Sequence, residues 1–455
     1  MENADIIFRT NDIRGVYGRD FDDDTAEKLG KAFGSFIGPG KRVVISRDVR
    51  PTGEKLKERM ISGMLAVGCD VVDIGMSTTP MMYFAVHQGK FDAGVSVTAS
   101  HNPSDWNGFK LVGPNASQFY QGGGLERIKK IFVDEDFSYG TRTGTSTKSD
   151  VTEEYVGFLL SRVKARGKLN IVIDPGNGAA CGIAEAVLRK AGHAVVVING
   201  EPDGTFPSRP SDPSEKNVAR LKSEVLARGA DMGMAFDGDV DRIALVDNLG
   251  RYVSSGNITI PIFARHYLRD NKGGKVVYDV CCSSCVEESI RDAGGVPVVS
   301  KVGQPAIKGR MAAEGAVFGG EYSSHLNFAE IHSFDDALYA GLKMAEIVSS
   351  EGRTLAKIVD SVPVYPTSEL REVHCDDDIK FDVVKKVSDH LKKNGFRTLD
   401  IDGVKAYSED GWVLIRASNT MSTIKMNAEA RSPAEADRLL EMAVKSVRDE
   451  IGRRK

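Results

Sequence analysis

A serine and a histidine stand side by side where an apolar stretch of the chain ends. Val95 and Val97 belong to a run that is typical of a buried strand, and the Asn102-Pro103 pair that follows Ser100-His101 is typical of a turn. A hydroxyl on a turn at the end of a strand can carry a covalent group. Taken alone, Ser-His-Asn-Pro is more often an ordinary turn, so its meaning depends on the rest of the chain.

Three aspartates alternate with other residues in a second segment, Asp237-Gly238-Asp239-Val240-Asp241-Arg242. Carboxylates sharing a small loop repel one another, which raises their pKa values or unfolds the loop unless a cation binds. Hard oxygen ligands suit Mg2+ or Ca2+. A calcium EF-hand needs Gly and Glu where this chain has Arg242 and Asn248. Apolar strands flank the segment, which therefore predicts a Mg2+ site rather than a solvated acidic turn. A phosphate on Ser100 would both bind the Mg2+ and be the group that is transferred.

Length and charge are those of a large enzyme. The 455 residues correspond to about three domains on length alone. The 60 basic and 64 acidic residues give a net charge of -4, and no basic stripe indicates nucleic-acid binding. Met1 to Asp5 lack the features of a secretory signal, and no apolar run approaches membrane-spanning length. Six cysteines fit a reduced compartment. We expect a cytoplasmic protein that binds neither membrane nor nucleic acid.

An α/β pattern occurs three times along the chain. Each time the sequence predicts strand, helix, strand, helix, strand, which requires parallel pairing with helical crossovers. The predicted strands lie at 41–46, 70–74 and 93–97, at 169–174, 194–198 and 231–236, and at 275–278, 296–299 and 316–319.

Polar residues follow the third strand of every repeat. They are Ser100-His101, the three aspartates, and the segment 320–325, which contains Glu321, Ser323 and His325. Ligands of α/β sheets bind beyond the carboxyl ends of the strands, so we expect the three loops to converge on one cleft. Glu321, Ser323 and His325 could bind the vicinal hydroxyls of a polyol. The alternative is that segment 320–325 is an ordinary polar loop.

The C-terminal segment differs from the three repeats. It predicts a helix over 381–394, strands over 412–415 and 424–430, and a closing helix over 433–450. Between the strands, Arg416, Ser418, Asn419 and Thr420 offer one cation and several donors, which suits a phosphate. The same residue types are also common in turns.

Together these segments resemble the α-D-phosphohexomutases, the phosphoglucomutase/phosphomannomutase family, over essentially the whole chain. The resemblance rests on the order and spacing of seven stretches: 8–15, 98–103, 107–110, 174–178, the Asp237 loop, the Glu321 loop and 416–420. It implies three tandem α/β domains with mixed, mostly parallel sheets and a C-terminal α+β domain, around a central cleft. The expected domains are 1–148 with the phosphoserine, 149–252 with the metal loop, 253–364 with the sugar loop and 365–455 with the phosphate loop.

The resemblance also implies a role for each candidate residue. Ser100 would be the phosphoserine and, with Asp237, Asp239 and Asp241, would hold Mg2+. Glu321 and Ser323 would bind sugar hydroxyls, and Arg14, Arg242 and Lys110 would neutralise the transferring phosphoryl group. The other phosphate would be bound by Arg416, Ser418, Asn419 and Thr420. Lys110 and His101 are the first candidates for general acid and base, followed by His325.

Family members convert hexose 1-phosphates and 6-phosphates into each other through a bound 1,6-bisphosphate, which also serves as activator. Glucose and mannose differ only at C2, so groups that read O3 and O4 accept both, and we expect dual specificity. A phosphoglucosamine mutase, a non-catalytic sugar-phosphate sensor and a phosphatase-like hydrolase are the alternatives. A hydrolase usually needs a second metal site, and the sequence offers one clear acidic triad.

Three positions depart from the family pattern. Ser324 stands where the sugar loop usually has Gly, which often serves a positive φ. Met421-Ser422 follows Thr420 in place of the usual Glu-Pro, and Gln304 stands where many members have His or Asp. We expect these departures to bear on the geometry of the C-terminal domain and on substrate preference.

Overall fold

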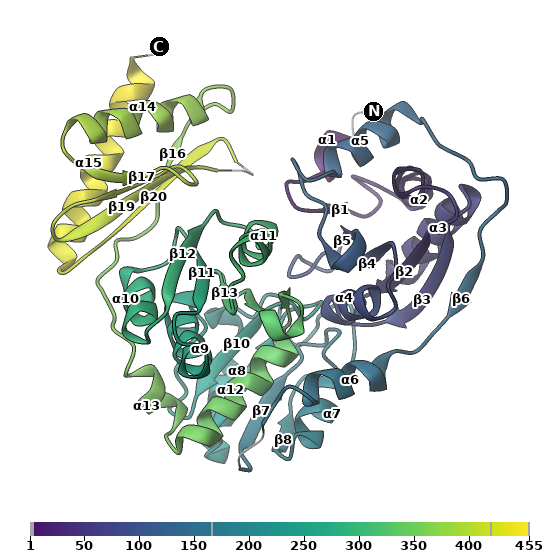
Figure 1. Ribbon diagram of the computed structural model, residues 1–455, viewed down its shortest axis with the longest axis horizontal. Helices are drawn as coiled ribbons and strands as arrows, with labels where there is room; N and C mark the ends of the chain where they lie inside the picture. Colours follow the sequence, from purple (N-terminus) through teal and green to yellow (C-terminus); the bar gives the residue numbers. More distant parts are fainter. Residues whose placement is uncertain (1–3, 165–166, 419–420, 454–455) are drawn as a thin grey trace. The chain divides into compact units, whose positions relative to one another are not determined.

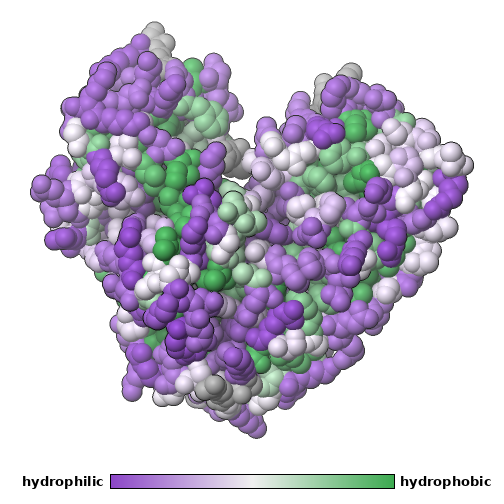
Figure 2. Space-filling model, in the orientation of Figure 1, coloured by the Kyte–Doolittle hydropathy of each residue, from purple (hydrophilic) through white to green (hydrophobic). Residues whose placement is uncertain are grey.

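The computed structural model describes residues 4–164, 167–418 and 421–453, and these form two compact units (Figure 1). The first unit contains Met1–Ser255 and Ser323–Val359, and the second contains Gly256–Tyr322 and Asp360–Lys455. Hydrophilic side chains cover most of the visible surface, and apolar residues are exposed on it in patches (Figure 2). No helix among the described residues has both the length and the apolar character that crossing a bilayer requires.

The first unit begins with a six-stranded sheet in the order β1-β5-β4-β2-β3-β6. The pairs β2–β3, β2–β4 and β3–β6 are parallel, whereas β1–β5 and β4–β5 are antiparallel. All five residues of β4 are buried, as expected for a strand covered on both faces. The bounds are β1 Ile13–Val16, β2 Arg42–Arg47, β3 Asp70–Met76, β4 Ala93–Val97, β5 Trp106–Val112 and β6 Ser146–Lys148.

Helices begin close to the strand ends of this sheet. The side chain of Asp22 caps α2 by accepting a hydrogen bond from the amide of Thr25 at 2.9 Å. Thr78 caps α4 in the same way, accepting from Met81 N at 3.1 Å, and Pro80 lies in the first turn. The helices are α1 Ala4–Ile7, α2 Asp23–Ile37, α3 Gly53–Ala66, α4 Thr79–Gln88, η1 Pro114–Ala116 and α5 Leu125–Asp134.

A second sheet of the first unit has the order β10-β9-β7-β8. Strand β7 pairs in parallel with β8 and β9, while β10 returns antiparallel to β9, with Ile243 opposite Phe236. This hairpin presents residues 237–242 at its tip. The strands are β7 Asn170–Asp174, β8 Ala194–Val197, β9 Met232–Phe236 and β10 Ile243–Asp247, with α6 Thr152–Leu160, α7 Ile183–Lys190, η2 Glu215–Asn217 and α8 Ala219–Arg228.

The part of the first unit that follows Tyr322 supplies a short antiparallel pair of strands and two helices. Its elements are β14 Leu326–Phe328, η3 Ala329–Ile331, β15 Phe334–Asp335, α12 Ala337–Glu351 and α13 Leu355–Val359.

The second unit contains the third α/β repeat and the C-terminal sheet. In the repeat, β11 pairs in parallel with β12 and β13. The C-terminal sheet is antiparallel, in the order β16-β20-β19-β18-β17, and buries its own apolar cluster against α14 and α15. The elements are α9 Gly256–Asp270, β11 Lys275–Asp279, α10 Ser284–Asp292, β12 Val296–Ser300, α11 Gln304–Glu314, β13 Phe318–Gly320, β16 Arg371–His374, α14 Lys380–Lys393, β17 Arg397–Leu399, β18 Val404–Tyr407, β19 Gly411–Ala417, β20 Thr423–Ala430 and α15 Pro433–Gly452.

The fold class predicted from the sequence is confirmed. All three strand-helix repeats are present with parallel pairing, and the C-terminal segment forms a separate α+β layer. The antiparallel strands β1, β5 and β10 make the sheets mixed.

Candidate active site

Ser100 lies just beyond β4 in a strained backbone conformation. It is 2% exposed and has φ +51°, a left-handed value that costs a residue with a side chain about 1 kcal/mol. The amide of Ser100 donates to Thr98 Oγ1 at 2.9 Å, and Thr98 Oγ1 donates to Asp48 at 2.7 Å. Such a conformation persists only where the surroundings fix it, and it points to a functional role.

A buried arginine that the sequence analysis did not identify holds the Ser100 loop. The guanidinium of Arg50 donates to the carbonyl oxygens of Ser100 at 3.0 Å and Asn102 at 2.6 Å. It also bonds the carbonyls of Pro103 and Trp106 and pairs with the Asp48 carboxylate. Arg50 follows β2, which lies beside β4, so its place at the end of a neighbouring strand was the available signal.

The aspartate loop lies directly against the serine. Ser100 Oγ donates to Asp237 Oδ2 at 2.9 Å, and the other oxygen of Asp237 accepts from the amides of Val240 and Arg242 at 2.9 and 3.1 Å. A Cβ at Gly238 would lie 2.6 Å from the carbonyl oxygen of Ser100, so only glycine permits this approach.

Lys110 and Thr79 complete the surroundings of the triad. Lys110 Nζ contacts Asp239 Oδ2 at 2.6 Å and also pairs with Asp241, while the Thr79 hydroxyl donates to Asp239 Oδ2 at 2.6 Å. Carboxylate oxygens of all three aspartates lie within 4.8 Å of one another. Among the described residues, Asp239 Oδ1 and Asp241 Oδ1 are buried without a hydrogen-bond partner.

The buried charges shift one another's pKa values. Burial and the neighbouring Asp241 and Asp239 raise the pKa of Asp237 well above its usual range. For Asp241, burial is outweighed by the positive charge of Lys110, and its pKa is lowered. Burial also opposes the charge of Lys110, but Asp239 and Asp241 raise its pKa well above the ordinary value. Lys110 is therefore protonated.

Arg242 links the two candidate histidines. Its Nε donates to His325 Nε2 at 2.7 Å, and its NH1 lies 3.0 Å from His101 Nδ1. A guanidinium can only donate, so both contacted ring nitrogens accept. Burial, followed by the charges of Arg242 and Arg14, lowers the pKa of His101 to about 2, which keeps it neutral.

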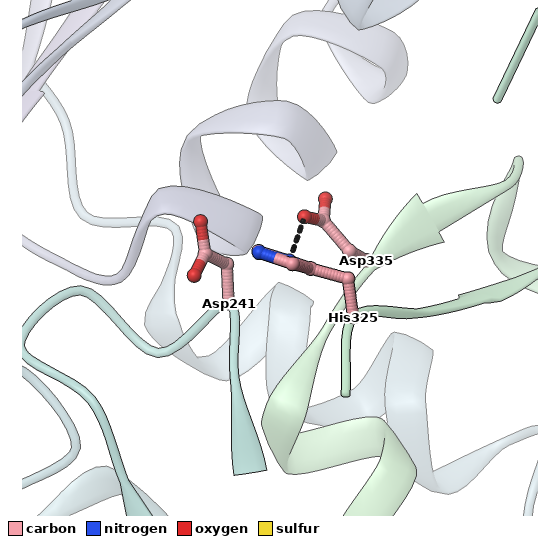
Figure 3. Close-up of side chains that lie close together, drawn as sticks. All are labelled: Asp241, His325 and Asp335. Atoms are coloured by element: carbon pink, nitrogen blue, oxygen red, sulfur yellow. Dashed lines mark hydrogen bonds and ion pairs between the residues drawn. The ribbon is translucent and has the colours of Figure 1, made fainter. Parts of the chain in front are cut away.

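His325 and Asp335 form a second group near the triad (Figure 3). His325 Nδ1 and Asp335 Oδ2 are 3.1 Å apart, and Asp241 lies on the other side of the ring (Figure 3). These three residues have the spacing of metal ligands. Both nitrogens of His325 are already engaged, however, and the neighbouring Arg242 repels a cation. We therefore assign this group to orienting His325 rather than to a second metal.

Arg14 lies on the serine side of the same unit. Its Nε donates to Asp12 at 2.8 Å and its NH1 to Asn102 Oδ1 at 2.7 Å. Burial opposes the charge of Arg14, but the negative charge of Asp12 raises its pKa above the ordinary value. The structure thus brings eight of the expected residues into one region of the first unit: Ser100, His101, Lys110, Asp237, Asp239, Asp241, Arg242 and His325, with Arg14 attached through Asn102.

The remaining candidates are found in other places. Glu321, Arg416 and Ser418 belong to the second unit, and the division between the units falls after Tyr322, so that exposed Ser323 belongs to the first. Arg416 pairs with Asp402 at 2.7 Å, and Ser418 Oγ accepts from the amide of Met421 at 3.2 Å. The expected phosphate ligands Asn419 and Thr420 lie outside the described residues.

Four family models match successive parts of the chain. Domains I, II and III of phosphoglucomutase/phosphomannomutase, each described as alpha/beta/alpha, match residues 5–138, 153–250 and 255–365, and the C-terminal domain matches 370–446. The chain belongs to the phosphoglucomutase/phosphomannomutase family. It is therefore a mutase, as the resemblance predicted.

Individual relatives agree over almost their whole length. A phosphoglucomutase/phosphomannomutase of Thermococcus kodakarensis is 32% identical over 98% of this chain and 99% of its own. A probable phosphoglucosamine mutase of Pyrococcus abyssi is 33% identical over 98% of each. The crystal structure of a phosphoglucomutase/phosphomannomutase family protein from Burkholderia thailandensis is 32% identical, with a TM-score of 0.91 over 98% of each chain.

The triad fits a divalent cation on its own geometry. Three buried carboxylates face one another, and two of their oxygens lack a partner among the described residues, an arrangement that is costly without added positive charge. Oxygen donors of this kind suit Mg2+. Lys110 supplies part of the required charge here by contacting two of the three carboxylates.

A second buried arginine, which the sequence analysis also did not identify, fixes the start of the aspartate loop. Arg209 donates to the carbonyl oxygen of Phe236 at 2.7 Å and pairs with Asp174 at 2.9 Å. Phe236 immediately precedes Asp237, so Arg209 holds the aspartate loop as Arg50 holds the Ser100 loop.

Ser324, which stands where the resemblance led us to expect Gly, has an unusual backbone conformation. Ser324 has φ +70° and is 8% exposed, so this position keeps the left-handed conformation that glycine adopts more easily.

Proposed function

We propose that this mutase interconverts hexose 1-phosphates and hexose 6-phosphates of both mannose and glucose, through a phosphoserine at Ser100 and a bound 1,6-bisphosphate. The observation that carries the proposal is the contact of the Ser100 hydroxyl with Asp237, inside a buried triad of carboxylates. The phosphoryl group passes from Ser100 Oγ to a sugar hydroxyl. After the bisphosphate has turned around, the other phosphoryl group returns to Ser100.

Within this proposal Asp237, Asp239, Asp241 and a phosphate on Ser100 would hold Mg2+. When bound, Mg2+ supplies positive charge to the phosphoryl oxygens. Phosphoryl transfer depends mainly on positioning and charge stabilisation. Arg14, Arg242 and protonated Lys110 supply further positive charge, and the loops anchored by Arg50 and Arg209 hold the serine and the metal ligands in place.

The protonation states of Lys110 and His101 bear on which residue acts as general acid. Lys110 is protonated and its raised pKa makes it hold that proton tightly, which suits a fixed positive charge better than a proton donor, whereas neutral His101 accepts from Arg242 on Nδ1 and is a poor proton donor there. Glu321 and Ser323 would bind sugar hydroxyls. The second phosphate would be bound by Arg416, Ser418, Asn419 and Thr420.

A coupled mutase assay tests the proposal. Purified protein with Mg2+ and a trace of glucose 1,6-bisphosphate is given glucose 1-phosphate or mannose 1-phosphate, beside the Ser100→Ala variant. We expect turnover of both sugars and a loss of about a thousandfold or more in the variant, because the nucleophile is removed. Equal activity of the variant would contradict the phosphoserine mechanism.

Glucosamine 1-phosphate is the informative third substrate, because the similar Pyrococcus abyssi protein is named a probable phosphoglucosamine mutase. A preference for it of about a hundredfold in kcat/KM, or about 2.7 kcal/mol, would replace dual specificity with that activity. Release of inorganic phosphate in place of the isomer would indicate a hydrolase.

A further inference from the structure

Hydrogen bonds in the second unit connect Arg416 with Glu321. The NH2 group of Arg416 donates to Asp402 Oδ2 at 2.7 Å, and the same carboxylate oxygen accepts from the amide of Val302 at 3.3 Å. The next amide, that of Gly303, donates to Glu321 Oε1 at 2.6 Å. Along this path only the backbone of Val302, from its own amide to the amide of Gly303, separates the groups bound by the two carboxylates.

A second path connects the same two residues. The NH1 group of Arg416 donates to Cys281 Sγ at 3.3 Å, and the amide of Cys281 donates to Asp279 Oδ1 at 2.7 Å. Asp279 Oδ2 accepts at 2.7 Å from the amide of Tyr322, which directly follows Glu321. The two paths close a ring in which each carboxylate holds main-chain amides.

The main chain beside Asp402 is packed tightly against Arg416. Gly403 has φ +82°, and a Cβ there would lie 2.2 Å from the carbonyl oxygen of Ile415 and 2.9 Å from Arg416 Cα. The turn that carries Asp402 is therefore fixed relative to Arg416. Both side chains are about four-fifths buried, so the ion pair is partly shielded from water.

We propose that Asp402 is a positioning residue that couples phosphate binding by Arg416 to sugar recognition by Glu321. The inference rests on the roles given to those two residues in the proposed function. Asp402 orients the guanidinium of Arg416 and, through Val302 and Gly303, sets the position of the Glu321 carboxylate. A sugar phosphate therefore encounters both groups already placed at the distance that the ring imposes.

Such coupling suits a substrate that binds in two orientations. The phosphate that is not being transferred is on O6 in one half-reaction and on O1 in the other. A fixed separation between the guanidinium of Arg416, which would bind the phosphate, and the carboxylate of Glu321, which would bind the hydroxyls, lets one site accept the sugar in either orientation. This separation is a property of the ring rather than of Arg416 or Glu321 alone.

A double-mutant cycle in binding tests the coupling. Glucose 6-phosphate is titrated by calorimetry into Ser100→Ala protein that carries Asp402→Asn, Glu321→Gln, both or neither. We expect Asp402→Asn alone to weaken binding about tenfold, but only about threefold or less once Glu321→Gln is present. Inorganic phosphate has no sugar hydroxyls for Glu321 to bind. Asp402→Asn should therefore weaken the binding of inorganic phosphate by only about threefold or less. The inference would be overturned if Asp402→Asn weakened the binding of glucose 6-phosphate by the same factor with and without Glu321→Gln.

Asp400→Asn is the matched control. Asp400 lies two residues away and bonds Lys392 at 2.6 Å and Ser388 at 2.5 Å instead of Arg416. Asp400→Asn should change the affinity for glucose 6-phosphate and for inorganic phosphate by no more than about twofold. An effect equal to that of Asp402→Asn would contradict the proposal. Should Asp402→Asn fail to fold, Asp402→Ser removes the same carboxylate and is expected to give the same coupling.

The cycle also separates the inference from the proposed function. Coupled binding in a protein that turns over no hexose phosphate would reject the proposed function and leave the inference intact. Normal turnover with additive effects of the two substitutions would reject the inference alone.

Discussion

At the scale of single residues, buried arginines determine the shape of the reactive loops. Arg50 bonds four carbonyl oxygens around Ser100, and Arg209 bonds the carbonyl oxygen that precedes Asp237. A guanidinium has five donors in a fixed plane, so one side chain can hold several main-chain groups at once. Ser100 keeps its left-handed backbone because the carbonyl oxygens around it are held in this way.

Ser324 offers a direct test of backbone strain. Its φ of +70° costs a serine about 1 to 2 kcal/mol, and glycine relieves this at a smaller cost in unfolded-chain entropy. We expect Ser324→Gly to raise the free energy of unfolding by about 1 kcal/mol in urea denaturation.

Ser323→Gly is the control for this substitution, because Ser323 is exposed and does not have a positive φ. It should lower the free energy of unfolding by about 0.5 kcal/mol. Destabilisation of similar size by both substitutions would mean that residue 324 is not strained.

The sequence supplied candidates for the reacting groups, but it did not indicate the residues that hold their loops. Ser100 and the three aspartates were recognisable because the chemistry needs those types at those spacings. Arg50 and Arg209 act through main-chain carbonyls that lie far along the chain, and no local spacing records such contacts. The contact of Asp402 with Arg416 likewise becomes visible only when β18 is paired with β19.

At the scale of elements, parallel pairing of the repeats could be predicted from local patterns, whereas the antiparallel pairing of the returning strands could not. β5 and β10 follow the serine and metal loops directly and pair antiparallel with the strands that precede those loops. Such a return depends on packing across the whole sheet rather than on local periodicity. It matters for the site, because β5 carries Lys110 to the aspartates.

The start of α12 contains a buried titratable cap. Asp336 accepts from Tyr339 N at 3.0 Å and from the Tyr155 hydroxyl at 2.6 Å, and burial raises its pKa to about 6. A raised pKa means that the folded state holds the proton more tightly, so stability is greatest below the unfolded value and is lost as pH rises through 6. Above pH 6 the raised pKa of Asp336 lowers the free energy of unfolding by up to about 3 kcal/mol relative to its value at low pH.

We therefore expect Asp336→Asn to be more stable than the unmodified protein at pH 8, by up to about 3 kcal/mol. The uncharged amide avoids the buried charge: its oxygen can still accept from Tyr339 N, and its NH2 group would donate to the Tyr155 hydroxyl oxygen, which reverses that hydrogen bond. The difference should narrow as the pH falls from about 6 to about 4. Urea denaturation across this range measures it, with exposed Asp437→Asn as control. A difference that is independent of pH would show that Asp336 does not titrate on unfolding.

At the scale of the whole molecule, the chain crosses between the two units three times, after Ser255, Tyr322 and Val359. The carboxylate triad belongs wholly to the first unit. The two tryptophans are divided between the units, Trp106 in β5 of the first and Trp412 in β19 of the second. Each unit therefore has its own fluorescent reporter of unfolding.

Mg2+ should stabilise the two units unequally. A ligand that binds only the folded state at a hundred times its Kd adds about 2.7 kcal/mol to the free energy of unfolding. We expect Mg2+ to raise the urea midpoint seen through Trp106 in a Trp412→Phe protein. The midpoint seen through Trp412 in a Trp106→Phe protein should move less, and Asp239→Asn should abolish most of the first shift because it removes the negative charge of one of the three carboxylates proposed to bind Mg2+. Equal shifts of both reporters would mean that the units unfold as one cooperative body, and persistence of the shift in Asp239→Asn would place the cation elsewhere.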